Sequence, residues 1–336
     1  AMLNKKDPPA AAAQLISGYH AVLPLTEQEL ELLPTLIAIR LCISVSISAY
    51  QQSQEPDNPY LSISERPAWD LLQRLAVIPP RLFTYTLRHA CGLTPYPGEN
   101  RLTSWLRENH GQASPLLPLD LPAANPLVFD WSVGSLEMGS PADFGDAQKE
   151  TERLFARLSA ADTAVGIGRY DEARLVYTGD AFKTDDDEWR TIHIGLDLFM
   201  PAGTPLYAPF AGTVHSFHDN AAPYDYGPTI ILQHQPAADL TFYTLYGHLS
   251  RDSLDGLQVG TAVKQGQEIG HMGDVAVNGG WPAHVHFQII GDLLGREGEF
   301  PGVAPASRRE VWLSLCPDPN LLLGIPAGRF PPEPVS

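Results

Sequence analysis

Apolar residues follow two different periods along this chain. Up to about residue 125 they recur at the spacing of helices, and from about residue 174 short β-branched and aromatic runs alternate with glycine, proline, asparagine and aspartate. Many short strands at close spacing are typical of an antiparallel sandwich or a barrel-like sheet. We therefore expect an α+β protein, with an N-terminal helical segment followed by an antiparallel β-sandwich or barrel-like domain.

Capping residues mark helix ends in the first part of the chain. Thr26 and Glu29 stand three positions apart, as in a capping box, and Gly92 follows an apolar run as a helix stop. Ser64 precedes a segment whose first turn would hold Pro67. The predicted helical segments are residues 27–33, 35–49, 69–75, 81–91 and 101–109.

The segment 35–49 allows two interpretations. Its apolar composition favours a helix, whereas the alternation of isoleucine or valine with serine over residues 43–48 also fits a strand. The longer run 32–49 is interrupted by Pro34, Arg40 and three serines. We therefore expect a buried helix here and no membrane span.

Strands dominate the second part of the chain. They are predicted at residues 191–199, 205–207, 212–217, 229–234, 241–246, 268–271 and 284–290. Residues 140–160 fit one amphipathic helix with Leu154, Phe155 and Leu158 on one side, and the proline-rich end fits an extended strap or linker. The predicted domains are a helical domain over 1–125, a connector with one helix over 126–173, a β domain over 174–325 and a proline-rich tail over 326–336.

Composition narrows the classes of partner. The chain has 336 residues, of which 22 are basic and 39 acidic, for a net charge of −17. Nucleic acids and anionic membranes attract basic patches, so neither is expected as a partner. Three cysteines far apart in the sequence form no CxxC pair and indicate a reducing compartment. Because no signal peptide is visible, we expect a cytoplasmic protein. Ala1 before Met2 indicates an expression scar, so the native chain could begin earlier, and a periplasmic or extracellular location stays open.

One predicted strand carries a histidine and an aspartate on the same face. In His193-Ile-Gly-Leu-Asp197 the polar residues and Gly195 share one side, and the apolar residues share the other. A straight strand would hold the backbones of His193 and Asp197 about 13 Å apart. That separation is close to the limit for two side chains that bind one metal ion, so we predict a bend or a strand start near Gly195.

Two further histidine motifs follow. His284 and His286 share a strand face with Gln288, and His248 stands in Tyr-Gly-His-Leu-Ser at the end of an aromatic strand. A single histidine on a strand is more often structural than a ligand, but coincidence is a poor explanation for all three motifs together. Two histidines and one carboxylate match a catalytic zinc site that keeps a fourth position for water.

His-x-x-x-Asp, Tyr-Gly-His-Leu-Ser and His-x-His-Phe, in this order, resemble the LytM/lysostaphin-type zinc metallopeptidases. The framing sequences at 201–205, 211–214 and 263–270 agree, and the resemblance covers about residues 176–290. It implies that His193, Asp197 and His286 bind Zn²⁺. It also implies that His248 and His284 form the catalytic pair: one acts as general base on the metal-bound water, and the other stabilises the oxyanion. Which histidine takes which role stays open.

The chain departs from that family at two positions. Gln288 replaces the glutamate often found two residues after the second histidine of His-x-His. Trp281 either narrows the cleft or packs within its loop. The acidic run 185–188 is most simply a solvated loop, with a lid or an inhibitory plug as the alternative. The histidines outside the motif are expected at the surface or in hydrogen bonds: His215, His218, His234 and His271.

A second resemblance concerns the rest of the chain. Residues 32–75, with Asn-Pro-Tyr at 58–60 and Trp69, resemble the closing helices of an aminoglycoside-phosphotransferase-like kinase domain. Residues 281–325 are similar to peptidase segments between such a kinase and a class III aminotransferase. The resemblance implies a fragment of a larger fusion, with kinase-like and aminotransferase domains as neighbours and without phosphotransfer activity.

The leading expectation is a zinc metalloendopeptidase in which metal-bound water attacks a peptide carbonyl. The resembling family acts on glycine-rich or cell-wall peptides, so the expected partner is a peptide of the peptidoglycan type. The alternative is a non-secreted zinc-binding module that regulates or positions neighbouring catalytic domains, with weak or no peptidase activity. All five motif positions are filled, which favours the enzyme.

Overall fold

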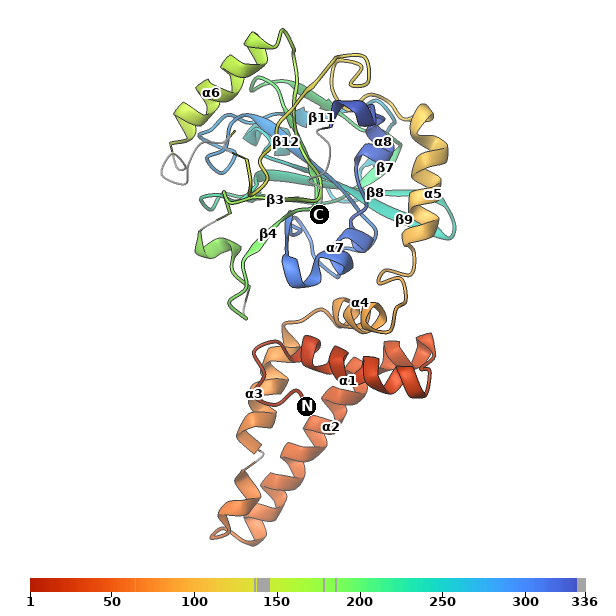
Figure 1. Ribbon diagram of the computed structural model, residues 1–336, viewed down its shortest axis with the longest axis vertical. Helices are drawn as coiled ribbons and strands as arrows, with labels where there is room; N and C mark the ends of the chain where they lie inside the picture. The colour runs from red at the N-terminus through yellow and green to blue at the C-terminus, as the bar shows by residue number, and fades with distance from the viewer. Residues whose placement is uncertain (64, 136, 138–145, 178, 185, 331–336) are drawn as a thin grey trace. The chain divides into compact units, whose positions relative to one another are not determined.

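The structure is a computed structural model (Figure 1), and it describes residues 1–63, 65–135, 137, 146–177, 179–184 and 186–330. The chain divides into two compact units, Ala1–Pro97 and Gly98–Ser336. The first unit is helical. Its helices are α1 (Pro8–Val22), α2 (Glu27–Gln54), α3 (Glu65–Ala76) and α4 (Pro80–Ala90), with the short 3₁₀ helix η1 (Pro59–Ser62).

The capping box at Thr26 and the helix stop at Gly92 are confirmed. The hydroxyl of Thr26 accepts the Glu29 N–H at 3.3 Å, and the Glu29 carboxylate accepts the Thr26 N–H at 2.7 Å, which completes the capping box at the start of α2. Helix α4 ends at Ala90 with Cys91 as its C-cap, and Gly92 follows with φ of +73°, a value that favours glycine. Pro67 lies in the first turn of α3, and Ser64 falls outside the described residues.

Helix α2 corrects the prediction of two segments. It continues through Pro34 to Gln54, so the alternation over residues 43–48 belongs to a helix and not to a strand. Pro34 is buried. It removes one backbone hydrogen bond of the second turn, and the helix continues because its inner side packs against the other helices. Leu30, Leu71, Phe83 and Leu87 form the centre of that core.

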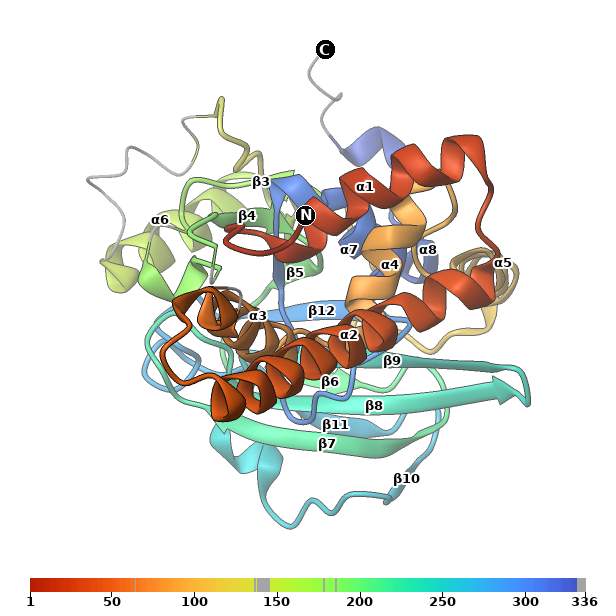
Figure 2. The same ribbon diagram turned by 90° about the horizontal axis from the view of Figure 1, so that it is seen from below.

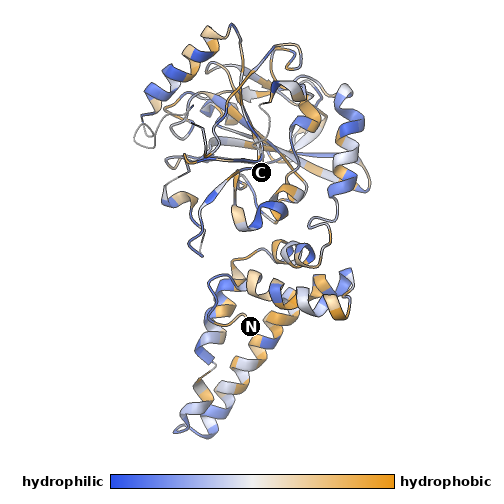
Figure 3. Cartoon of the chain, viewed as in Figure 1, coloured by the Kyte–Doolittle hydropathy of each residue, from blue (hydrophilic) through white to orange (hydrophobic). Residues whose placement is uncertain are grey.

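The expectation that this helix is buried is wrong. Six large apolar side chains on its outer side are between 46% and 67% exposed, and we call them the α2 stripe: Leu32, Leu36, Ile39, Ile43, Ile47 and Tyr50. Their spacing of three and four residues places them on one helix face, and Figure 3 shows hydrophobic residues along this helix. Because α2 is unbroken, it is also long and apolar enough to cross a membrane, as are the core helices of many soluble proteins.

The second unit is built on one large sheet. Its strand order is β1-β2-β5-β12-β9-β8-β7-β10, and neighbouring strands are antiparallel except β1 and β2. Figure 2 shows the long strands β7, β8 and β9 side by side. The strands of this sheet are β1 (Leu127–Val128), β2 (Gly166–Gly168), β5 (Leu196–Phe199), β7 (Gly212–Asn220), β8 (Gly227–Ala237), β9 (Leu240–Gly247), β10 (Ala262–Val263) and β12 (His284–Ile290).

Smaller elements complete the second unit. A three-stranded sheet has the order β13-β4-β3, and a two-stranded sheet joins β11 to β6. These elements are α5 (Glu99–Asn109), α6 (Ala147–Ala160), β3 (Glu172–Ala173), β4 (Arg190–His193), β6 (Pro205–Tyr207), β11 (Glu268–His271), β13 (Val303–Pro305), α7 (Arg309–Leu315) and α8 (Asn320–Leu323). The prediction of a helical segment followed by a large sheet is confirmed. Within the described residues no pairing joins β1 to β10, so the prediction of a sandwich or a closed barrel is not confirmed.

Three boundaries differ from the sequence prediction. Helix α5 belongs to the second unit, because Leu102 and Leu106 are buried in the core of the sheet, so the chain divides after residue 97 rather than 125. Helix α6 is described from Ala147, with Leu154 and Leu158 buried as predicted, whereas residues 140–145 lie outside the described part. The expected extended strap instead contains α8, whose Leu322 packs into the core.

Candidate metal and catalytic site

The predicted bend at Gly195 is present. The chain leaves the three-stranded sheet after His193 and enters the large sheet at Leu196, with a bend at Gly195 between them. This change of direction brings His193 Nε2 to 3.1 Å from Asp197 Oδ1. Gly195 is also required for space, because a Cβ there would lie 2.4 Å from the ring of His286.

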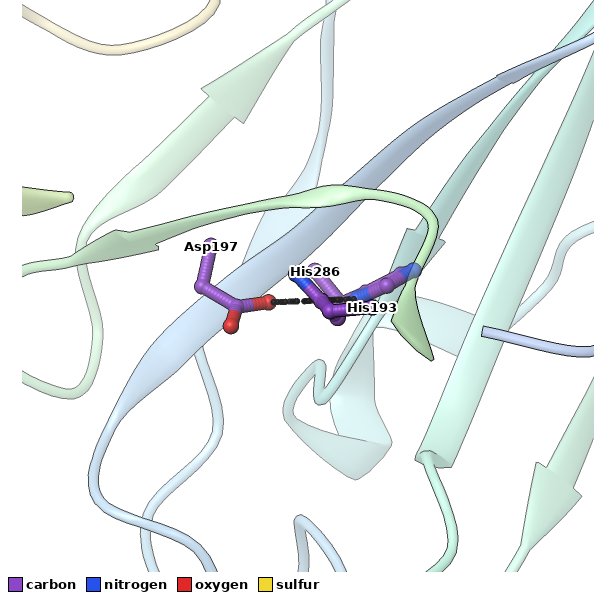
Figure 4. A group of neighbouring side chains, drawn as sticks. All are labelled: His193, Asp197 and His286. Atoms are coloured by element: carbon purple, nitrogen blue, oxygen red, sulfur yellow. Dashed lines mark hydrogen bonds and ion pairs between the residues drawn. The ribbon is translucent and has the colours of Figure 1, made fainter. Parts of the chain in front are cut away.

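Strand β12 supplies the third residue of this group. His286 lies opposite Asp197 in the pairing of β12 with β5. Its Nδ1 is 3.0 Å from His193 Nε2 and 3.1 Å from Asp197 Oδ1, and Figure 4 shows the three side chains converging. Tetrahedral zinc with bonds of about 2.0–2.2 Å would separate its ligand atoms by about 3.3–3.5 Å. The three buried donor atoms therefore suit one small cation with little movement.

Hydrogen bonds fix which nitrogen of each histidine is free. Nδ1 of His193 donates to the carbonyl oxygen of Arg169 at 2.7 Å, so Nε2 presents its lone pair to the group. Nε2 of His286 donates to Gln288 Oε1 at 2.9 Å, so Nδ1 presents its lone pair. The Gln288 amide is oriented in turn, because its NH₂ donates to the Pro301 carbonyl at 3.2 Å. Such outer contacts are typical of metal-ligating histidines.

His248 and His284 lie beside this group. Their ring centres are 4.2 Å apart, and His284 Nε2 is 3.9 Å from Asp197 Oδ1. Nδ1 of His248 donates to the Asn278 carbonyl at 2.8 Å, and Nδ1 of His284 donates to the Pro282 carbonyl at 2.7 Å. Both Nε2 atoms are therefore without a proton when the rings are neutral. The structure thus brings together all five residues that the sequence motifs singled out.

Burial sets the charges of the site. It lowers the pKa of His193 to about 4. It also lowers the pKa of His248 well below the usual value of a histidine, and it lowers the pKa of His284. Burial alone would raise the pKa of Asp197, but His193 and Arg174 outweigh it and hold this pKa well below the usual range. At neutral pH Asp197 is therefore ionised and the imidazoles of His193, His248 and His284 are neutral, and an ionised carboxylate and a neutral imidazole are the forms that bind metal ions.

Aromatic side chains line one side of the site. The Trp281 ring lies 6.4 Å from His248 and 6.4 Å from Tyr177, so it both packs against another aromatic ring and borders the histidine cluster. The Tyr226 ring lies 5.4 Å from His248 and 5.2 Å from His286. Its buried hydroxyl has no hydrogen-bond partner among the residues that the structure describes. Sequence reasoning missed Tyr226, because a tyrosine before a strand glycine forms no recognisable motif with the histidines.

The remaining predicted residues lie elsewhere. His234 is buried and bonded to the Ala211 carbonyl and the Thr244 hydroxyl, which confirms a hydrogen-bonding role. In the acidic run, Asp186 pairs with Arg308 at 3.3 Å, and residue 185 lies outside the described part. Glu188 accepts hydrogen bonds from the N–H and the hydroxyl of Ser307. These contacts attach the run to residues 307–308.

Comparison with known proteins places a family domain on this unit. Residues 191–295 match the model of Peptidase family M23. Residues 191–295 are therefore an M23 peptidase domain by sequence, and the resemblance found from the motifs is confirmed at that level. No match was found among curated proteins.

Solved structures that are similar to parts of the chain include peptidases. A zinc containing peptidase from Vibrio cholerae is 27% identical, with 30% of this chain and 27% of that chain covered and a TM-score of 0.24. The catalytic domain of the antimicrobial peptidase lysostaphin from Staphylococcus simulans is 27% identical, with 36% and 80% covered and a TM-score of 0.26. Helicobacter pylori Csd3 is 24% identical, with 36% and 31% covered and a TM-score of 0.24. The chain thus spans less than a third of the Vibrio cholerae peptidase and of Csd3.

Proposed function

We propose that the second unit is a zinc-dependent metalloendopeptidase in which His193, Asp197 and His286 hold the metal. The observation that carries the proposal is the convergence of their three donor atoms to within 3.1 Å of one another, with both imidazole protons directed away to other acceptors. When bound, zinc supplies Lewis acidity that activates water and polarises a carbonyl group. The match to Peptidase family M23 supports the same reaction class.

The second pair of histidines would move the protons. We assign the general base to His284, because its unprotonated Nε2 lies 3.9 Å from Asp197 Oδ1, and that carboxylate stabilises the imidazolium that forms. His248 would stabilise the oxyanion of the tetrahedral intermediate. Its Nδ1 stays on the Asn278 carbonyl, so the neutral ring would have to take up a proton at Nε2 as negative charge develops on the substrate oxygen, against the burial that lowers its pKa.

The substrate class follows from the family resemblance. We propose glycine-rich or cell-wall-like peptides, so pentaglycine and muropeptides are the substrates to test. Cleavage that requires zinc and is lost in His284→Ala and His248→Ala, with zinc still bound, supports the enzyme. Zinc binding with both substrates intact supports the alternative, a zinc-binding regulatory or scaffold module of a multidomain enzyme.

We also propose a packing role for the first unit, as the closing helices of a kinase-like domain beside an aminotransferase in a longer polypeptide. The α2 stripe supports this proposal, because apolar residues on one helix face are usually covered by a further element. The reading frame on either side of this chain tests it. Flanking sequence without kinase-type or aminotransferase-type motifs would reject it.

A further inference from the structure

A buried arginine contacts the carboxylate of Asp197. The side chain of Arg174 is 2% exposed, and its Nη1 donates to Asp197 Oδ2 at 2.7 Å. Its other partners are Glu172 Oε2 at 2.8 Å, the Tyr177 hydroxyl at 3.0 Å, the Arg169 carbonyl oxygen at 3.0 Å and the Trp131 ring at 5.0 Å from Cζ. With partners on several sides, the planar guanidinium is held in one position.

The two oxygens of Asp197 have different partners. Oδ2 accepts the hydrogen bond from Arg174, whereas Oδ1 lies 3.1 Å from both His193 Nε2 and His286 Nδ1. A carboxylate can bind a metal ion through one oxygen or through both, and a hydrogen bond that holds one oxygen on the far side opposes the second contact. Because Oδ2 is held by Arg174, Oδ1 alone faces the position between the two histidines.

The segment that carries Arg174 also orients His193. Strand β3 pairs with β4 so that Glu172 lies opposite His193, and the Arg169 carbonyl accepts the Nδ1 proton of His193. Residues 169–174 therefore fix two of the three candidate ligands. This segment lies before the residues that match the family model, 191–295.

Charge balance gives a reason for an arginine at this place. Arg174 and Asp197 are both buried, and an unpaired buried carboxylate is costly. The positive charge of Arg174, whose Nη1 lies 2.7 Å from Asp197 Oδ2, compensates the carboxylate. The row of charges continues outward with alternating sign through Glu172, Arg169 and Asp130.

We propose that Arg174 is a positioning residue of the metal site, which holds Oδ2 of Asp197 so that the carboxylate offers the metal Oδ1 alone and a coordination position stays open. This inference rests on the proposed zinc-binding function and deepens it.

The test replaces Arg174 in the full chain and measures metal binding directly. In Arg174→Met the carboxylate is free to turn, so zinc affinity, measured by competition with a chelator, should fall about 10–100-fold. The absorption spectrum of the Co²⁺-loaded protein should change from intense bands of a four-coordinate ion to weaker bands as a second oxygen binds. Arg174→Lys keeps a positive charge but can donate to fewer partners than the guanidinium. Its zinc affinity and its Co²⁺ spectrum should therefore lie between those of the wild type and Arg174→Met.

A matched control is a second buried arginine outside the site. Arg88 binds Glu27 Oε2 at 3.1 Å and the Thr94 carbonyl at 2.9 Å in the first unit, and Arg88→Met should leave zinc affinity and the cobalt spectrum unchanged. If Arg174→Met does not fold, Tyr177→Phe removes one partner of the guanidinium and should cause a smaller change in the same direction.

Unchanged zinc affinity and an unchanged cobalt spectrum in the folded Arg174 or Tyr177 variants would overturn the inference. A wild-type chain that binds no zinc would overturn both the inference and the proposed function. A wild-type chain that binds zinc but cleaves no peptide would reject the peptidase alone, and the metal titrations would still decide the role of Arg174.

Discussion

The hydroxyl of Tyr226 is buried against Gly302 without a hydrogen-bond partner among the described residues. An unpaired buried donor costs about 1–3 kcal/mol. We therefore predict that Tyr226→Phe raises the free energy of unfolding by about 1 kcal/mol, measured by urea denaturation. The control is Tyr246→Phe, since the Tyr246 hydroxyl is hydrogen-bonded to the Thr244 hydroxyl at 3.0 Å, and the loss of this bond should lower stability by about 1 kcal/mol. A loss of stability in Tyr226→Phe would contradict the prediction.

His234 makes stability depend on pH. Burial lowers its pKa to about 4, although the Ala211 carbonyl opposes this shift, and the ring stays neutral in the folded protein. In the unfolded chain its pKa is about 6.5, so between these values the unfolded state binds a proton that the folded state does not. This contribution to stability is full above about pH 6.5 and is lost as the pH falls toward 4, by about 3 kcal/mol at most.

The measurement is urea denaturation of the wild type and His234→Gln over this pH range. The variant should lose less stability on acidification than the wild type, because one of the buried neutral imidazoles is gone. If the free energy of unfolding falls equally with pH in the two proteins, His234 has the same pKa in the folded and the unfolded state, which would contradict the prediction.

At the scale of the element, the bend between β4 and β5 decides whether the site forms. A Cβ at Gly195 would lie 2.4 Å from two ring atoms of His286, closer than atoms can approach. We predict that Gly195→Ala displaces His286 and abolishes zinc binding, measured by metal analysis. Gly111→Ala, where an added Cβ meets nothing within 4 Å, is the matched control and should bind zinc as the wild type does. Normal zinc content in Gly195→Ala would show that the bend is not needed.

Local patterns predicted some elements well and others poorly. The alternation in His284–Ile290 placed His284, His286 and Gln288 on one face of β12, and the distance argument located the bend at Gly195. The exposure of the α2 stripe could not be predicted, because local hydropathy does not show which faces of a helix find a partner. Arg174 was missed for a similar reason: its contact with Asp197 joins segments 23 residues apart and forms no motif.

At the scale of the whole molecule, the negative charge is unevenly distributed. Residues 1–97 hold 7 basic and 8 acidic residues, a net charge of 7 − 8 = −1, which leaves 15 − 31 = −16 for residues 98–336. A field of this sign attracts cations and is screened by salt. We predict that kcat/KM for a lysine-containing peptide falls as salt rises, whereas kcat/KM for an acidic peptide rises. Equal salt dependence for both peptides would contradict a role for this field.

The convergence of His193, Asp197 and His286 is tested most directly by metal analysis of the purified chain and its alanine variants. The account predicts about one zinc per chain in the wild type, as for a site with three protein ligands, and its loss in His193→Ala, Asp197→Ala and His286→Ala. A wild-type chain that takes up no zinc, or variants that retain it fully, would contradict the account.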